Sequence, residues 1–301
     1  MHPAVYLKRL SDNENVCLIR NPIKTVLHKE QHEIFKFVAS MCKYKVYENV
    51  KSVVPSYELD VYIPDMKIAI EFDGIYWHNE LFKEPDYHLR KTEECNKLGI
   101  KLIHIFESEW LYKQEIVKSR LCSIFNHTTK IYARQCKIGI VSNDESIQFL
   151  NKNHIQGACH SKYRYGLYYN NELVSLMTFG KSRFRKNEIE LLRFCNKLNT
   201  TVVGGASKLF KHFLNDIVSY ADRRWSTGNL YEKLGFKLIN TSKPNYYYII
   251  DGILKNRMNY QKHMLVQQGF DANKSEHDIM LERKIYRIYD CGMLKYYKHI
   301  D

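Results

Sequence analysis

The feature that most constrains this chain is a pair of short apolar segments between residues 57 and 74. Apolar and polar side chains alternate from residue 57 to residue 63, which is the period of a β-strand with one buried face. Pro64 and Asp65 then turn the chain, and the next segment, residues 66 to 73, is apolar on both sides and stops at Gly74. We therefore predict a β-hairpin whose second strand is buried.

Segments with a helical period flank this hairpin. Apolar side chains recur at spacings of three and four over residues 28 to 42, which predicts a helix. A second helix is expected from about residue 88 to 98, ended by Gly99, and a buried strand follows over residues 100 to 106. Another helix is expected over residues 110 to 125. This order predicts an α/β domain in which helices flank a mixed sheet.

A polar loop near residue 130 separates this domain from a second one. Alternation returns over residues 163 to 169 and 173 to 179, which predicts another hairpin, and a strand follows over residues 189 to 194. A glycine-rich turn at Gly204 then opens an amphipathic helix that runs through Leu214. We divide the chain into an N-terminal extension (residues 1–24), a first domain (25–129), a second domain (130–250) and a basic and aromatic C-terminal extension (251–301).

Charge and composition narrow the possible partners. The chain has 46 Lys and Arg against 33 Asp and Glu, a formal net charge of +13, which favours polyanions such as nucleic acid. No apolar run approaches the roughly 20 residues of a membrane span, and the N-terminus lacks the apolar core of a secretory signal. The eight cysteines stand singly, without the spacing of a zinc site, as is typical of reduced thiols. We expect an intracellular protein that makes no membrane contact.

Three carboxylates lie on the predicted hairpin. Asp60 is on its first strand, and Glu71 and Asp73, two residues apart, share one face of the second. Because Glu71 lies within an apolar run, its buried carboxylate needs a compensating partner, and a metal ion would supply one. Hydrolysis of a phosphodiester uses hard divalent cations held by such carboxylates. His78 follows five residues after Asp73 and could act there as a general base or as a proton donor.

The order of these residues resembles that of the very-short-patch repair endonucleases and the phage homing endonucleases built on the same fold, a branch of the PD-(D/E)xK nuclease superfamily. The resemblance covers roughly residues 28 to 112 and implies a restriction-endonuclease-like mixed sheet in the first domain. The residues on which it rests are Glu58-Leu59-Asp60, Ile70-Glu71-Phe72-Asp73-Gly74, Tyr76-Trp77-His78, and Leu98-Gly99 followed by the strand that ends in Phe106-Glu107.

By position, the resemblance implies that Asp60 binds the metal and that His78 is the catalytic histidine. It also implies a glutamate on the first helix, and Glu30 and Glu33 compete for that role. Helical geometry places Glu30 on the inward face, four residues before Ile34, which favours it over Glu33.

Two departures from the family pattern concern proton transfer. His88 falls where the repair enzymes have a further acidic residue, and Asp73 replaces the lysine of the superfamily. Lys91, one helical turn after His88, is then the nearest cation. For His88 and Lys91, a plain role on the surface of a helix is the alternative to a catalytic one.

The second domain contains two segments, residues 204 to 209 and residues 229 to 236, that resemble the N-acetyltransferase (GNAT) fold. In that family a glycine-rich turn opens a helix and holds the pyrophosphate of acetyl-CoA through backbone N–H groups. Thr201 stands where the family begins this motif with Arg or Gln, so the resemblance favours the fold over the activity. We expect a GNAT-like α+β domain reused to hold DNA, with acyl transfer as the alternative.

Basic and aromatic side chains are interleaved in three clusters of the second domain. Cationic groups neutralise phosphates and aromatic rings stack on exposed bases, whereas a solvated basic face is the alternative for any one cluster. The predicted DNA contacts are Lys162, Arg164, Arg183, Arg185, Lys186, Arg223 and Arg224.

Together these features predict a metal-dependent DNA endonuclease of the homing type, which hydrolyses double-stranded DNA with Mg²⁺ or Mn²⁺ and needs no obligatory protein partner. Asp60 and Glu71 are expected to bind the metal. The alternatives are a GNAT-type acyltransferase, a DNA-base-modifying enzyme, or a DNA-binding protein with an inactive nuclease domain. The predicted catalytic group is His78, Glu30, Asp73, His88 and Lys91.

Overall fold

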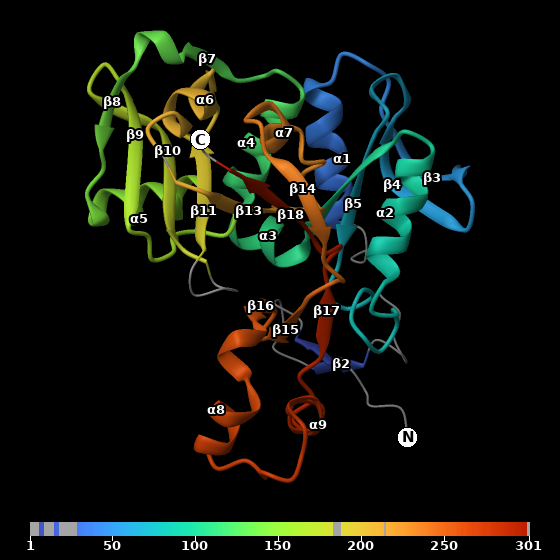
Figure 1. Ribbon diagram of the computed structural model, residues 1–301. Helices are drawn as coiled ribbons and strands as arrows, with labels where there is room; N and C mark the ends of the chain where they lie inside the picture. The colour runs from blue at the N-terminus through green and yellow to red at the C-terminus, as the bar shows by residue number, and fades with distance from the viewer. Residues whose placement is uncertain (1–5, 9–14, 18–28, 183–187, 214, 300–301) are drawn as a thin grey trace.

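The chain forms a mixed α/β fold with several sheets (Figure 1). The computed structural model describes residues 6–8, 15–17, 29–182, 188–213 and 215–299. Most of the predicted N-terminal extension therefore lies outside the described residues, apart from the paired strands β1 (Tyr6–Lys8) and β2 (Asn15–Cys17). The predicted DNA contacts Arg183, Arg185 and Lys186 also lie outside them.

The first sheet confirms the predicted hairpin. Its strands are, in spatial order, β3 (Tyr47–Val54), β4 (Tyr57–Ile63), β5 (Ile68–Asp73) and β6 (Lys101–Phe106). β4 and β5 are antiparallel with Val61 opposite Ile70, and the 3-10 turn Pro64–Met66 joins them. β5 and β6 are parallel, so the sheet is mixed.

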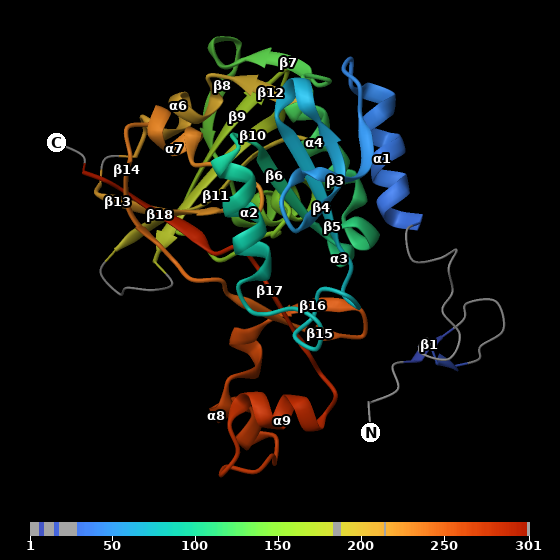
Figure 2. The same ribbon diagram turned by 90° about the vertical axis from the view of Figure 1, so that its right-hand side faces the viewer.

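Helices cover both faces of this sheet (Figure 2). On one face, Ile34 of α1 and Trp110 of α3 are buried in a core with Ile70 and Ile103, and on the other face Cys95 of α2 packs in a core with Leu102. The bounds of these three helices are α1 (Lys29–Met41), α2 (Tyr87–Lys97) and α3 (Glu107–Tyr112), and α4 (Gln114–Ile124) follows α3.

The single helix expected over residues 110 to 125 is wrong, because Lys113 leaves helical geometry at φ −135° and separates α3 from α4. Nζ of Lys113 donates to the carbonyl oxygen of Ile155 at 2.5 Å, which holds the break against the second half of the chain.

The second sheet has seven strands in the order β14-β18-β13-β11-β10-β9-β8. Neighbouring strands are antiparallel except β11 and β13, which are parallel. The hairpin predicted over residues 163 to 179 is confirmed as β9 and β10. The strands are β8 (Lys137–Ile140), β9 (Tyr163–Tyr169), β10 (Glu172–Lys181), β11 (Ile189–Asn196), β13 (Ile217–Asp222), β14 (Lys237–Thr241) and β18 (Met293–Lys298).

Short elements connect these strands. Gly204 has a left-handed backbone, φ 78°, at the start of α6, so the predicted glycine turn does open a helix, although the helix ends at Phe210 rather than Leu214. The side chains of Leu209 and Phe210 are buried in the core of the seven-stranded sheet. The other connecting elements are β7 (Thr129–Tyr132), a 3-10 turn (Ala133–Gln135), α5 (Asn143–Asn153), β12 (Thr200–Val203), α6 (Gly205–Phe210) and α7 (Asn229–Lys233), and β7 pairs with β12.

The C-terminal residues form a third, smaller sheet below the other two in Figure 1. It consists of β15 (Tyr246–Ile250), β16 (Ile253–Asn256) and β17 (Arg287–Tyr289), and its helical elements are a 3-10 turn (Arg257–Tyr260), α8 (Lys262–Gln267) and α9 (Glu276–Glu282). After β17 the chain turns at Gly292 and returns as β18 between β13 and β14. The last strand of the chain therefore belongs to the seven-stranded sheet, and the division at residue 250 stays a prediction. Within the described ranges, no helix combines the length and hydrophobicity that a membrane span requires.

Candidate functional site

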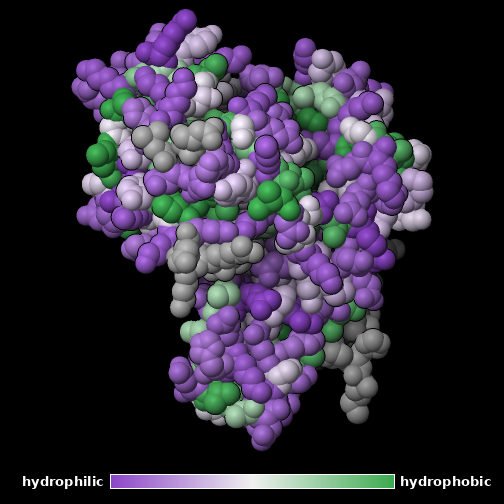
Figure 3. All heavy atoms as spheres, in the orientation of Figure 1, coloured by the Kyte–Doolittle hydropathy of each residue, from purple (hydrophilic) through white to green (hydrophobic). Residues whose placement is uncertain are grey.

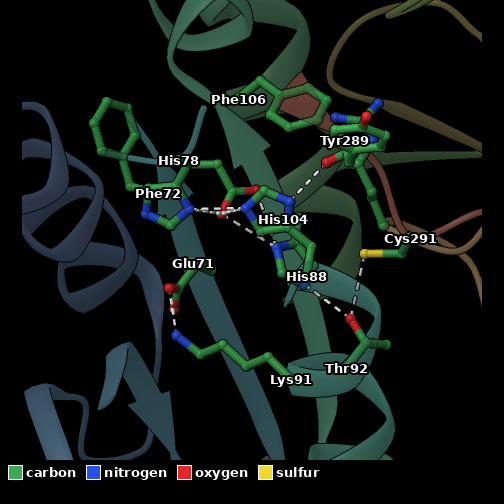
Figure 4. Close-up of polar contacts among 12 residues, drawn as sticks. Glu71, Phe72, His78, His88, Lys91, Thr92, His104, Phe106, Tyr289 and Cys291 are labelled. Atoms are coloured by element: carbon green, nitrogen blue, oxygen red, sulfur yellow. Dashed lines mark hydrogen bonds and ion pairs between the residues drawn. The ribbon is translucent and has the colours of Figure 1, made fainter. Parts of the chain in front are cut away.

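Asp73 ends β5, has no exposed surface and is surrounded by three imidazole rings. These rings belong to His78, His88 and His104, which lie together in Figure 4. Its Oδ2 lies 3.0 Å from Nδ1 of His104, and its Oδ1 lies 3.2 Å from Nδ1 of His78 and 3.4 Å from Nε2 of His88. Burial alone would raise the pKa of this carboxyl, but its interactions with His88 and His104 outweigh burial and hold the pKa well below the usual range. Asp73 is therefore a carboxylate inside the protein.

The rings of His78 and His88 are within 3° of parallel, with centroids 5.1 Å apart, and they meet edge to edge through their nitrogens. Nδ1 of His88 lies 2.6 Å from the carbonyl oxygen of Tyr289, so this nitrogen has the hydrogen and donates it. Burial lowers the pKa of His88 to about 3, so the ring is neutral near pH 7 and its Nε2 is a lone pair. Nδ1 of His78 lies 2.8 Å from that lone pair and is the donor between the two rings.

His104 supplies the third imidazole from the middle of β6, and the sequence analysis did not single it out. Its Nε2 lies 2.9 Å from Oγ1 of Thr92, which in turn lies 3.4 Å from Sγ of Cys291. Burial lowers the pKa of His104, but Cys291 and Asp73 together raise it well above its usual value, so the ring is cationic and pairs with Asp73. The sequence signal for this residue is a histidine within an otherwise apolar strand.

Glu71 and Lys91 form a buried ion pair next to this group, with exposed fractions of 3% and 2%. Burial lowers the pKa of Lys91, but the charges of Glu71 and Asp60 outweigh it and raise that pKa. Asp60 is half-buried, and its Oδ2 accepts a hydrogen bond of 2.8 Å from the backbone N–H of Phe72. Burial and the nearby charge of Glu71 raise the pKa of Asp60 well above its usual value. The structure thus brings Asp60, Glu71 and Lys91 into one cluster.

The two candidate glutamates of α1 have different surroundings. Oε2 of Glu33 accepts a hydrogen bond of 3.2 Å from Nε1 of Trp110. Glu30 is half-buried, and its charge contributes to the raised pKa of Glu107, for which burial is the largest cause. Oε2 of Glu107 in turn accepts a hydrogen bond of 2.8 Å from the backbone N–H of Ile75, in the loop that leads to His78. Through Glu107, Glu30 is therefore close to this loop.

Several side chains that were predicted to contact DNA interact with other residues of the protein. Arg224 is buried and donates to both carboxylate oxygens of Glu109 at 3.1 Å and to Asp222 at 2.8 Å. Arg164 donates to the backbone carbonyls of Val141 and Ser161. Arg224 joins elements of the fold from a buried position, so its assignment to a DNA-binding surface is corrected, whereas that of the half-buried Arg164 stays a prediction. Arg223 donates to Glu93 of α2 at 3.3 Å, and Lys162 lies over the ring of Tyr163.

A second candidate site is a fork in the seven-stranded sheet, defined by the diverging ends of β11 and β13. The two strands pair only over residues 189–191 and 217–219, although β11 continues to Asn196 and β13 to Asp222. Within the described part of the chain, no ladder pairing joins the two strands beyond Leu191 and Ser219. The fork therefore leaves a stretch of backbone edge between two central strands.

Tyr231 and Arg120 provide polar groups at the fork. Oγ of Ser219, the last paired residue of β13, donates to the carbonyl oxygen of Leu191 at 3.0 Å. Burial raises the pKa of the nearby Tyr231 hydroxyl and outweighs Ser219, which lowers it. Arg120 comes from α4 of the first domain and interacts electrostatically with Asp222 on β13 and Cys195 on β11. Nε of Arg120 is buried and has no hydrogen-bond partner among the described residues. Tyr231 lies in the segment 229–236 that resembles the GNAT fold, but neither Tyr231 nor Arg120 was predicted as a site residue.

Comparison with protein-family models and with curated protein sequences gives no match. Among solved structures, the chain is similar to a Bacillus subtilis acetyltransferase in complex with CoA, with 16% identity and a TM-score of 0.31 over 55% of this chain and 99% of the other. It is also similar to a GNAT family acetyltransferase from Elizabethkingia anophelis with acetyl-CoA bound, with 14% identity and a TM-score of 0.31 over 55% of this chain and 99% of the other. A GNAT family acetyltransferase from Bacillus cereus gives 11% identity and a TM-score of 0.31 over 55% and 98%.

The prediction of an endonuclease that depends on Mg²⁺ or Mn²⁺ is corrected by these observations. All three structures named above are acetyltransferases, and two of them contain CoA or acetyl-CoA. The magnesium site predicted on Asp60 and Glu71 is also wrong for a physical reason: the ammonium group of Lys91 already pairs with Glu71 and neutralises it. The buried carboxylate that needed a partner has a lysine rather than a metal.

The ion pair between Glu71 and Lys91 leads to a stability prediction. Lys91→Met leaves Glu71 buried without its cation, so we expect a loss of about 3–5 kcal/mol in the free energy of unfolding, measured by urea denaturation. The double variant Glu71→Gln/Lys91→Met removes both charges and is expected to recover most of that loss.

Lys97→Met is the matched control, because Lys97 forms an exposed pair with Glu94 on the same helix. It should change the free energy of unfolding by less than about 1 kcal/mol. A Lys91→Met protein as stable as Lys97→Met would show that the buried pair contributes nothing to the fold.

Proposed function

We propose that this chain transfers an acyl group from a coenzyme A thioester to an acceptor amine at the fork between β11 and β13. The observation on which the proposal rests is the divergence of two central parallel strands after only three paired residues. Such a divergence is costly unless something satisfies the exposed backbone groups. A ligand with amide groups of its own is suited to that task.

The pantetheine arm of coenzyme A has two amides in an extended chain. An extended ligand can add to a free strand edge through backbone hydrogen bonds, in the same way as a peptide adds to a sheet. Bound along the edge of β11, the arm would bring its thioester toward the point where β11 and β13 meet. Ser219 and Tyr231 lie at that point.

Tyr231 is suited to act as the acid of the reaction. The amine nitrogen attacks the thioester carbonyl carbon, and the C–N bond forms as the C–S bond breaks. The amine loses one proton to water, and the leaving thiolate takes one from the Tyr231 hydroxyl, which regains its proton from solvent. Burial raises the pKa of Tyr231, which keeps the hydroxyl protonated near neutral pH.

Arg120 supplies positive charge at the open end of the fork. Its guanidinium has one buried N–H that no described residue accepts, and burial lowers its pKa. A partner with a partial or full negative charge would satisfy this group, and both the thioester carbonyl and the phosphates of coenzyme A fit that requirement.

Isothermal titration with acetyl-CoA tests this proposal. We expect one site per chain with a dissociation constant between about 1 μM and 1 mM, as is usual for enzyme substrates. Tyr231→Phe is expected to retain that affinity while release of the CoA thiol, followed with a panel of primary amines, falls at least about 100-fold.

Tyr112→Phe, which changes an exposed tyrosine of α3, should match the wild type in both assays. Absence of heat at millimolar acetyl-CoA, or full turnover by Tyr231→Phe, would contradict the proposal.

We further propose double-stranded DNA as the macromolecular partner of this chain. The support is the net charge of +13 and the predominance of hydrophilic side chains on the face seen in Figure 3. Lys162 over Tyr163 and Lys43 over Tyr44 place cations beside rings that could stack on bases. Coenzyme A thioesters and DNA are both found inside cells, and we propose an intracellular location for the chain.

Fluorescence anisotropy of labelled duplex DNA tests this partner. Affinity should fall linearly with salt concentration on a log–log plot, and Lys162→Glu should reduce the slope by at least about 1. Lys274→Glu is the control of equal charge change, because Lys274 is already paired with Glu282. Binding that does not respond to salt, or no binding at all, would exclude this role.

A further inference from the structure

We propose that Asp73, His78 and His88 form a site for one transition-metal cation, with Zn²⁺ as the ion that fits the donor set. The proposal concerns different residues and a different ion from the magnesium site corrected above. It is also independent of acyl transfer, because its ligands come from β5, α2 and the loop between them, and not from the fork.

Three donor atoms, one from each residue, lie close together. Nδ1 of His78 lies 2.8 Å from Nε2 of His88 and 3.2 Å from Oδ1 of Asp73, and the last two atoms are 3.4 Å apart. A point about 1 Å out of the plane of such a triangle lies about 2 Å from all three atoms, which is the Zn–N and Zn–O bond length. The spacing of the donors therefore fits the ion, and the two imidazole rings would turn to direct their lone pairs at it.

The hydrogen-bond pattern leaves lone pairs at that point. His88 donates its Nδ1 hydrogen to the Tyr289 carbonyl at 2.6 Å, so Nε2 of the neutral ring presents a lone pair. Oδ1 of Asp73 is a second acceptor. Without a cation, a single hydrogen on Nδ1 of His78 has to serve both acceptors. With a cation, His78 moves that hydrogen to its other ring nitrogen and all three donors bind the ion.

Hydrogen bonds with neighbouring groups fix the orientation of two of the ligands, as is typical of metal sites. Tyr289 fixes the ring of His88 through its carbonyl, and His104 donates to Oδ2 of Asp73 at 3.0 Å, which turns Oδ1 toward the other two donors. His88 and Asp73 are buried, whereas the side chain of His78 is 13% exposed. A fourth ligand, a water or a substrate atom, would therefore approach from the side of His78.

The donor set selects the metal. Two imidazole nitrogens and one carboxylate oxygen suit Zn²⁺ and neighbouring late transition metals, whereas Mg²⁺ prefers oxygen ligands and retains several waters. The eight cysteines provide no competing site in the sequence, because none is spaced as a C-x-x-C pair.

Titration of the full chain with zinc chloride, after treatment with a chelator and dialysis, tests this site. We expect one Zn²⁺ per chain by calorimetry and elemental analysis, a rise in melting temperature on binding, and no displacement by millimolar Mg²⁺. His78→Ala removes a partly exposed ligand and should weaken Zn²⁺ binding at least 100-fold. His88→Gln should do the same.

His32→Ala is the control, because His32 lies on α1 and pairs with Glu48 outside the site. Substitution by Co²⁺ adds a spectroscopic readout: visible absorption typical of nitrogen and oxygen ligands in a low-coordinate site supports the proposal. Zn²⁺ binding that is absent from the wild type, that is unchanged in both His78→Ala and His88→Gln, or that shows cobalt–thiolate absorption would overturn it.

Discussion

The burial of two carboxylates on β5 is the constraint on which the polar half of this structure depends. Glu71 and Asp73 lie in a strand whose other residues pack in apolar cores on both faces. A buried carboxylate is unstable without a charged or hydrogen-bonding partner. Each of the two carboxylates has its own partner: Lys91 of α2 pairs with Glu71, and the imidazole of His104 pairs with Asp73.

This requirement joins parts of the chain that are far apart in sequence. His88 is fixed by the carbonyl of Tyr289, and Thr92, which holds His104, contacts Cys291. Both C-terminal residues lie about 200 positions after their partners: Tyr289 ends β17 of the small C-terminal sheet, and Cys291 lies between β17 and β18. The last part of the chain therefore completes the surroundings of the buried histidines.

The sequence predicts the local features of this region well. The alternation in residues 57–63 and the apolar run that follows predict the β4–β5 hairpin, and the residues on it single out Asp60, Glu71 and Asp73, with His78 five residues later. The family resemblance adds His88 and Lys91, and the structure gathers all six residues in two adjoining clusters. Periodicity indicates which face of a helix or strand is buried, but it does not indicate which residues pack against that face. For that reason the partner of Glu71 was expected to be a metal although Lys91 fills the role.

Long-range contacts account for the other differences. His104 lies in an apolar strand where its period gives no hint of a partner, and Tyr289 and Cys291 meet the site only through the path of the chain from β17 to β18. Arg224 was expected at a DNA surface because basic clusters are common there, but it is buried between Glu109 and Asp222. The fork also depends on the distance over which β11 and β13 stay paired, which their sequences do not specify.

In this arrangement the buried charge of Asp73 is balanced by a cationic His104, while His88 remains neutral with its hydrogen on Nδ1. Nitrogen NMR of the histidine side chains in chelator-treated protein measures these protonation states directly, since the ring shifts distinguish both tautomers and the imidazolium. Near neutral pH we expect an imidazolium for His104 and a neutral ring protonated on Nδ1 for His88. A doubly protonated His88, or a neutral His104, would contradict this arrangement.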